Sequence, residues 1–167
     1  MNKRMMTQTP KFHISEVIRL ICNNFNLDTR RVLLRAGLPA DYLDGHAMPV
    51  DGAQYYDIWE AIDSERSDPA FAAELAKGAI EQGFDSSIYS FYSSPNVREG
   101  LKRKALIKPY IAPIHMSVTD YGAHMALSFG TVIPGRPLPA LIGWFDLVFF
   151  VMAIRDATGE NLSLIHI

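Results

Sequence analysis

The sequence lacks the features that would place it in most functional classes. Cys22 is its only cysteine, which excludes an intramolecular disulfide and a cysteine-based zinc site and fits a reducing compartment. It contains no G-x-S-x-G elbow, no H-E-x-x-H, no G-x-G-x-x-G and no phosphate-binding glycine loop. These are common signatures of hydrolases, zinc peptidases and nucleotide-binding proteins. We therefore expect no catalysis, no cofactor and no metal.

Strong charge and long apolar runs are also missing. A net charge of −2 over 167 residues gives no general attraction to nucleic acid or anionic membrane. The N-terminus has no apolar core of a signal peptide, and the longest apolar stretch, Leu138–Ile154, is interrupted by Asp146. A membrane span needs about 20 apolar residues. A content of 49% hydrophobic and 20% charged residues is typical of a folded domain. We predict a cytoplasmic protein, with a disordered lead-in over residues 1–10 and one domain over 11–161.

The five histidines do not repeat at the spacing of a metal site. His115 and His124 could face each other across a predicted hairpin, but a two-histidine site there would lack an obvious third ligand. Solvated strand histidines are the favoured interpretation.

The first half of the chain reads as helices. Apolar residues at helical spacing predict helices over His13–Phe25, Thr29–Ala36, Gly52–Ser64 and Pro69–Glu81. Asp28 and the Val50-Asp51 pair stand where helix N-caps are expected, and Gly37 stands where the second helix should end. Trp59 is interpreted as a core anchor and not as a ligand platform.

The first two helices have the layout of a helix-turn-helix, with Arg30, Arg31 and Arg35 on the second. Helix pairs of this kind are common packing units, and no pattern of base-reading Asn or Gln accompanies the arginines. The packing interpretation is therefore favoured over DNA binding by this pair.

The stretch Phe84–Ala112 is the predicted organising unit. An aromatic run ending at Tyr92 precedes a helix that we expect to be capped by Ser94, to begin at Pro95 and to stop at Pro109. Its predicted apolar stripe consists of Val97, Leu101 and Ala105. Its basic residues are assigned to the solvent face: Arg98, Lys102, Arg103, Lys104 and Lys108.

The second half adds strands and a long helix. Alternating apolar residues predict an antiparallel hairpin formed by Pro113–Asp120 and Ala123–Val132. Leu138–Ala157 then reads as a helix that is apolar around most of its circumference, so it must be covered on several sides. The resulting fold class is α+β: an N-terminal helical bundle, then an antiparallel β-hairpin and a long packed helix.

Several segments in this order resemble the N-terminal effector domain of AraC-type transcription regulators, the arabinose-binding-like variant. They are RVLLRAGLPADYL, PVDGAQYYDIWEAI, SDPAFAAELA and YSSPNVREGLKRKALIKPY, within residues 14–160. The last is the most specific, since the family commonly has Ser-Ser-Pro-Thr-Leu-x-Glu-Ala-Leu there. Asn96-Val97 replaces Thr-Leu in this chain, and Gly100 replaces Ala.

The resemblance implies a sensory and dimerisation domain that responds to a small-molecule or protein effector. A homodimer is expected, and DNA would be bound only through a C-terminal pair of helix-turn-helix units. That C-terminal half is missing from this sequence. The alternative is a helical small-molecule-binding or protein-interaction module unrelated to transcription.

A ligand site is predicted from the aromatic residues around the central stretch and the long helix. Tyr89, Tyr92, Trp144 and Asp146 would combine aromatic walls, hydroxyls and one carboxylate, with Tyr110 at the rim. Asp146 is unusual as a carboxylate within an apolar helix, and it could line a pocket or face water beside Arg136.

The last six residues have a separate interpretation. Residues 162–167 match the translation of a transposase mosaic end used in sequencing libraries, so we expect a non-native, adapter-derived tail. The alternative is the beginning of a native strand, because Leu and Ile alternate there suitably.

Overall fold

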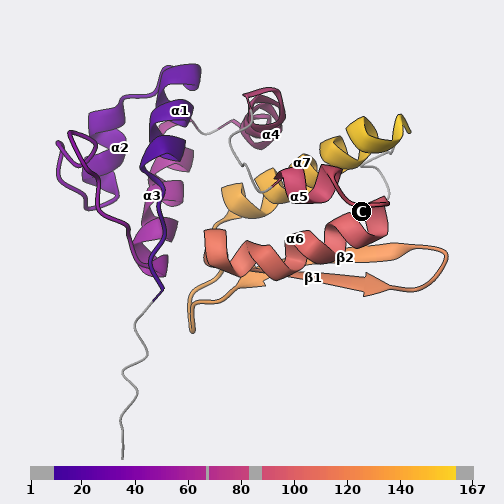
Figure 1. Cartoon of the computed structure of the whole chain (residues 1–167). Coiled ribbons are helices and arrows are strands. Elements are labelled where there is room, and N and C mark those ends of the chain that lie inside the picture. Colours follow the sequence, from indigo (N-terminus) through magenta and orange to yellow (C-terminus); the bar gives the residue numbers. More distant parts are fainter. Residues whose placement is uncertain (1–9, 67, 83–87, 161–167) are drawn as a thin grey trace, which may run out of the picture.

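The computed structural model describes residues 10–66, 68–82 and 88–160 (Figure 1). The predicted lead-in falls outside them except for Pro10, as do Phe84 of the aromatic run and the predicted tail 162–167. In the described part the elements are α1 (Ser15–Phe25), α2 (Thr29–Arg35), α3 (Gly52–Glu65), α4 (Phe71–Gln82), α5 (Tyr89–Tyr92), α6 (Val97–Ile111), β1 (Ile114–Asp120), β2 (Met125–Thr131) and α7 (Ala140–Thr158).

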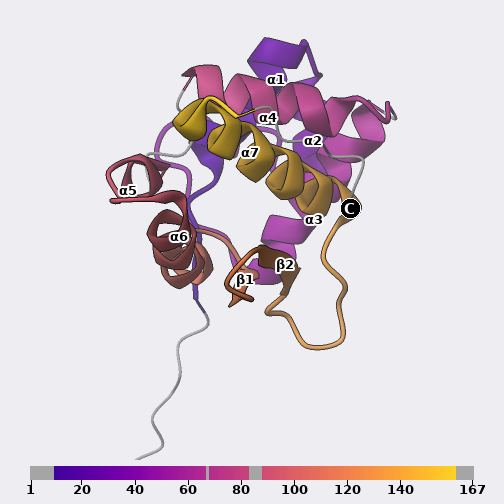
Figure 2. The ribbon, with the colours of Figure 1, turned by 90° about the vertical axis from the view of Figure 1, so that its right-hand side faces the viewer.

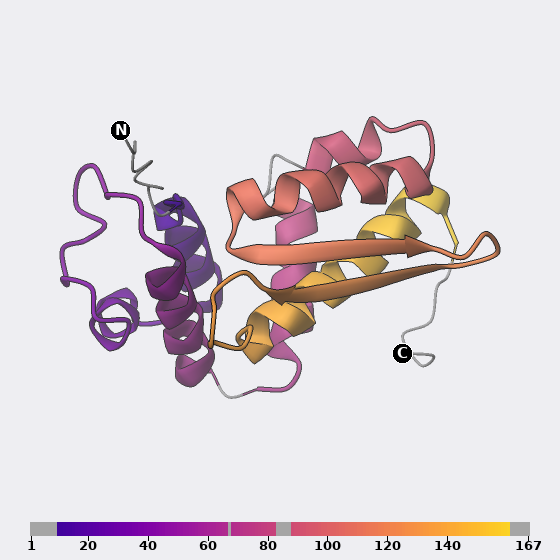
Figure 3. The same cartoon turned by 90° about the horizontal axis from the view of Figure 1, so that it is seen from below.

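The helices α1, α2 and α3 form one group, at the left in Figures 1 and 3. Two predicted N-caps are confirmed. Asp28 Oδ1 accepts a hydrogen bond from the Arg31 N–H at 3.1 Å, and Asp51 Oδ1 accepts one from the Gln54 N–H at 2.9 Å. Each bond satisfies a backbone donor that the first helical turn leaves without a helical acceptor.

Two of the three arginines of α2 pair with α3. Nε of Arg31 and Nε of Arg35 lie 3.0 and 3.1 Å from Oε1 of Glu65, whose side chain is 6% exposed. Arg35 also donates a hydrogen bond to the Ser64 hydroxyl at 2.7 Å. These contacts tie α2 to α3, which agrees with the packing interpretation of this helix pair.

The remaining elements form a second group around the hairpin. β1 and β2 are antiparallel, with Ile114 opposite Thr131 and Asp120 opposite Met125. As Figure 3 shows, α6 runs alongside the hairpin. Figure 2 shows α4 lying along α7 above them. The predicted α+β class, with a helical first part, a hairpin and a long final helix, is confirmed.

Two apolar clusters hold these groups together, and α4 and α7 belong to both. The first halves of the two helices supply Phe71 and Leu141 to the cluster around α1, α2 and α3. Their second halves supply Ala79 and Phe150 to the cluster formed with α5, α6 and the hairpin. This explains why α7 is apolar around so much of its circumference.

The predicted start of the central helix is wrong by two residues. Asn96 is the N-cap of α6, and its Oδ1 accepts a hydrogen bond from the Glu99 N–H at 3.0 Å. Ser94 instead donates from its hydroxyl to the Ser90 carbonyl at 2.7 Å, which joins the turn to α5. Pro95 therefore precedes the helix. Both Ser and Asn are good caps, and the local sequence does not choose between them.

The predicted end of the same helix is also wrong. Pro109 lies inside α6, which continues to Ile111. A proline removes one N–H donor and disfavours the helical conformation of the residue before it. Here only two helical residues follow Pro109, and the Ala112 N–H still bonds to the Lys108 carbonyl at 3.1 Å.

The two hairpin histidines do not face each other. His115 lies opposite Gly130, whereas His124 lies in the connecting turn and stacks on Tyr121 with ring centroids 4.9 Å apart. The described residues contain no cluster of three or more His, Cys, Asp or Glu that could hold a metal ion. Among the described residues, no helix combines the length and apolarity that crossing a membrane requires.

Candidate functional site

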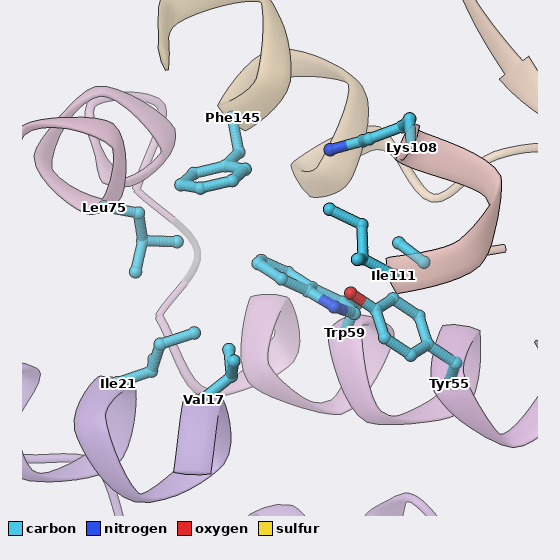
Figure 4. A pocket seen from close by; sticks show the side chains of 9 residues that line it. Val17, Ile21, Tyr55, Trp59, Leu75, Lys108, Ile111 and Phe145 are labelled. Atoms are coloured by element: carbon cyan, nitrogen blue, oxygen red, sulfur yellow. The ribbon is translucent and has the colours of Figure 1, made fainter. Parts of the chain in front are cut away.

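A cavity of about 120 Å³ lies where the two groups of helices meet (Figure 4). Its walls come from α1, α3, α4, α6 and α7, together with Ala112 just after α6. The lining residues are Val17, Ile21, Tyr55, Trp59, Leu75, Lys108, Ile111, Ala112 and Phe145.

Helical periodicity explains how α1 and α3 contribute their walls. Val17 and Ile21 are four residues apart on α1, and Tyr55 and Trp59 are four apart on α3, so each pair lies on one helix face. The Trp59 ring packs against Phe145 of α7, with centroids 5.6 Å apart. Residues of the apolar cluster around α1, α2 and α3 therefore also form most of the cavity surface.

A buried ion pair stands at the edge of this apolar surface. Lys108 lines the cavity from α6, and its Nζ donates a hydrogen bond of 2.6 Å to Oδ1 of Asp146 on α7. Lys108 is 7% exposed and Asp146 is 1% exposed. In Figure 4 the Lys108 amine points from α6 toward α7 above the cavity. Burial removes both charges from water, so each needs its partner.

The indole of Trp59 carries a polar group that the fold leaves unsatisfied. Trp59 is 4% exposed, and its Nε1–H has no hydrogen-bond acceptor among the described residues. Buried N–H groups nearly always have a partner, so an exception needs an explanation. Figure 4 shows this nitrogen on the edge of the indole toward Tyr55, in the cavity wall. The nitrogen lies just beneath the cavity surface, where water does not reach it, so an acceptor atom of a bound molecule would satisfy this donor once a neighbouring side chain shifts.

The lining is suited to binding. It contains lysine and tyrosine but no carboxylate, histidine, serine or cysteine that could act as base or nucleophile. Cys22 lies elsewhere in the core, and burial raises the pKa of its thiol, which disfavours the reactive thiolate.

Comparison with known proteins identifies the family. A family model described as the arabinose-binding domain of AraC transcription regulators, N-terminal, matches residues 27–167. The chain belongs to this family. No curated protein and no solved structure matches it. The AraC-type arabinose-binding domain is an effector-binding regulatory domain, so the site of interest is one that binds a ligand.

This AraC-type domain does not bring the predicted ligand residues together. Tyr89, Tyr110 and Trp144 are 67%, 85% and 61% exposed. Tyr92 lines one surface hollow, next to Pro95 and Thr158, and Trp144 lines another, next to Ala72 and Leu141. Asp146 alone is linked to the cavity, through Lys108.

Tyr92 has an environment distinct from the cavity. Burial, together with a hydrogen bond to the nearby Asp156 carboxylate, raises the pKa of Tyr92 to about 12. Its phenol therefore stays protonated over the whole physiological range.

The assignment of α6 lysines to the solvent face is wrong for two of them. Lys104 is 1% and Lys108 is 7% exposed. The spacing of these lysines already indicated their burial, because Leu101, Lys104 and Lys108 stand at i, i+3 and i+7 on one helix face. The apolar context of Asp146 was a second signal, since a buried carboxylate requires a cation. Arg136 is not that cation: it pairs with Asp57 at 2.8 Å.

Proposed function

We propose that this domain is the sensory half of a cytoplasmic AraC-type transcription regulator, and that its effector binds in the cavity between the two helix groups. Family membership supports an effector-binding role. The observation that favours this cavity is the Trp59 N–H, which has no acceptor among the described residues and lies just beneath the apolar wall of a cavity that Lys108 also lines.

The position of the cavity suggests how binding would be transmitted. A ligand there would contact Val17 and Trp59 in one helix group and Lys108 and Phe145 in the other. Its binding energy would therefore favour one relative packing of the groups over others. In the intact regulator that packing would be relayed to DNA-binding units beyond this domain.

The cavity assignment can be tested with toluene as a small apolar probe. In a Trp144→Phe background, Trp59 is the only tryptophan, so its fluorescence reports on the cavity. We expect toluene to change that fluorescence in a saturable way. Val17→Phe places a ring in the cavity and should abolish the change, whereas Leu34→Phe, at an exposed position on α2, should not.

Ile111→Phe provides a second filled cavity if Val17→Phe is poorly folded, since Ile111 is another lining residue. An equal toluene response in the filled and control variants would contradict the assignment, as would the absence of any response.

We further propose that the regulator is a homodimer. Leu106 and Tyr110 are 74% and 85% exposed and lie four residues apart on α6, so they form an apolar strip on its outer face. If the strip is the contact, Leu106→Asp with Tyr110→Asp should convert dimers to monomers in sedimentation equilibrium. The control is Tyr121→Asp, at an exposed turn. A monomeric parent chain would refute this part.

DNA binding is assigned to units outside this domain. The near-neutral charge and the pairing of Arg31 and Arg35 with Glu65 favour at most non-specific association, with a Kd weaker than ~10⁻⁶ M at physiological salt. Sequence-selective, sub-micromolar binding in a gel-shift titration would show that α2 reads DNA.

A further inference from the structure

On the basis of the proposed function, we propose a chemical class for the effector. The cavity takes a small, uncharged, mainly apolar molecule that carries a hydrogen-bond-accepting oxygen and is about as large as one substituted aromatic ring. Four observations lead to this class: the volume, the apolar walls, the donors, and the charge at the cavity.

The volume limits the ligand to a single ring. The cavity measures about 120 Å³, whereas an engineered apolar cavity of about 150 Å³ holds one benzene molecule. A molecule with two fused rings or a long chain would need the helices to separate. A compact aromatic or branched compound fits with small adjustments of side chains.

The walls exclude a sugar. Val17, Ile21, Leu75, Ile111 and Phe145 offer only hydrocarbon. A pentose carries a hydroxyl on nearly every carbon, and each hydroxyl would lose its water on entry. Burial of polar groups without new hydrogen bonds is unfavourable, and the few polar atoms in this lining cannot satisfy so many hydroxyls.

The available donors call for an acceptor on the ligand. The indole N–H of Trp59 is a donor only, and its acceptor is missing among the described residues. The Lys108 ammonium has three donor hydrogens, one of which is directed to Asp146. Once a small side-chain shift uncovers the indole N–H, a carbonyl or ether oxygen facing Trp59 would satisfy it and could also approach the ammonium.

The charge at the cavity favours a neutral ligand over an acid. Asp146 already neutralises the one cation in the lining, at an N–O distance of 2.6 Å. A carboxylate ligand would bring a second anion beside the pair. The free energy needed to remove that carboxylate from water would not be offset, because the lining offers no second cation to pair with it. Lys104, the other buried lysine of α6, is not part of the lining.

Three compounds of nearly the same shape separate the effect of a hydrogen-bond acceptor on binding from the effect of charge. Acetophenone carries a carbonyl, isopropylbenzene has no acceptor, and benzoate is an anion. Calorimetric titrations of the full chain with each, and with L-arabinose, would be compared among wild type, Trp59→Phe and Trp144→Phe. Trp144→Phe is the matched control, since Trp144 is the other tryptophan and is exposed.

We expect Trp59→Phe to weaken acetophenone binding about fivefold more than isopropylbenzene binding, because one hydrogen bond is lost only for the ketone. Trp144→Phe should change neither. Benzoate and arabinose should bind more weakly than acetophenone by at least about tenfold.

The chemical class is overturned if Trp59→Phe affects both aromatic ligands equally, or if benzoate or arabinose binds more tightly than acetophenone. In those cases toluene would still enter the cavity, so the proposed site would survive. Failure of every compound to bind, toluene included, would instead remove the site itself. A loss of acetophenone binding in Trp144→Phe alone would transfer the site to the hollow beside α7.

Discussion

Removal of the Lys108 charge should destabilise the domain strongly, and a nearby lysine provides the control. Lys108→Met keeps the length of the side chain but deletes the ammonium that lies 2.6 Å from Asp146. Both residues are more than nine-tenths buried. Lys102→Met lies on the same helix, where Lys102 pairs with Glu99 at 3.2 Å with both side chains close to half exposed.

The two substitutions should differ several-fold in free energy. Breaking a buried ion pair costs about 3–5 kcal/mol because a charge is left in a poorly solvated place. An exposed pair contributes about 0–1 kcal/mol, since water and salt screen it. A domain of this kind has a total stability of about 5–15 kcal/mol, so Lys108→Met should remove a large part of it.

The double variant separates the cost of leaving one buried charge unpaired from the stabilisation that the ion pair itself provides. Lys108→Met with Asp146→Leu removes both charges of this pair and fills the space with apolar atoms. Such replacements are often neutral or stabilising, so we expect the double variant to be more stable than Lys108→Met alone. Urea denaturation followed by circular dichroism would measure the free energy of unfolding of wild type, the two single variants and the double variant. If unfolding is two-state, the dependence of this free energy on urea concentration should be the same in all four.

Two results would refute this reasoning. One is a Lys108→Met chain that loses no more stability than Lys102→Met. The other is a double variant as unstable as the single one, which would mean that lost packing, and not charge, explains the effect.

Three further predictions concern the turn and helix around the central stretch. Gly100→Ala should destabilise the domain by about 1–3 kcal/mol, because the new Cβ would lie 2.7 Å from Cδ2 of Phe91. This steric effect should outweigh the higher helix propensity of Ala, which is about 1 kcal/mol. An unchanged urea midpoint would show that α5 moves freely. Asn96→Ala should cost about 1 kcal/mol as a lost N-cap, and far-ultraviolet melting of Ser94→Ala should show a smaller loss; the reverse order would restore Ser94 as the cap. Because the pKa of Tyr92 is raised to about 12, the protonated phenol stabilises the fold below pH 10, and this contribution is lost as pH rises toward 12. Absorbance titration at alkaline pH should lose its latest step in Tyr92→Phe, and a titration identical to wild type would contradict the assignment.

Local features of the fold could be predicted where one residue decides the outcome. Asp28 and Asp51 each stand directly before a run with helical periodicity, so their roles follow from the sequence. At the start of α6, Ser94 and Asn96 compete, and the choice depends on the bond from Ser94 to α5. Pro109 could not be placed inside the helix from the sequence, because nothing local shows that α6 continues for two residues beyond it.

The cavity could not be predicted, because five helices and Ala112 build its walls. Periodicity correctly assigned Trp59 to the core, but it could not show that the indole N–H would lack an acceptor. The pairing of Lys108 with Asp146 joins residues 38 positions apart. Aromatic content alone led to Tyr89 and Trp144, which the fold leaves on the surface.

The most direct test of the account is a crystal structure of the chain with acetophenone. The account predicts the ring inside the cavity, in contact with Trp59 and Phe145, with the carbonyl oxygen at hydrogen-bonding distance, about 2.7–3.2 Å, from Nε1 of Trp59. The Lys108–Asp146 pair should stay intact. Acetophenone bound at Trp144 or Tyr92, with the cavity beside Trp59 empty, would contradict it.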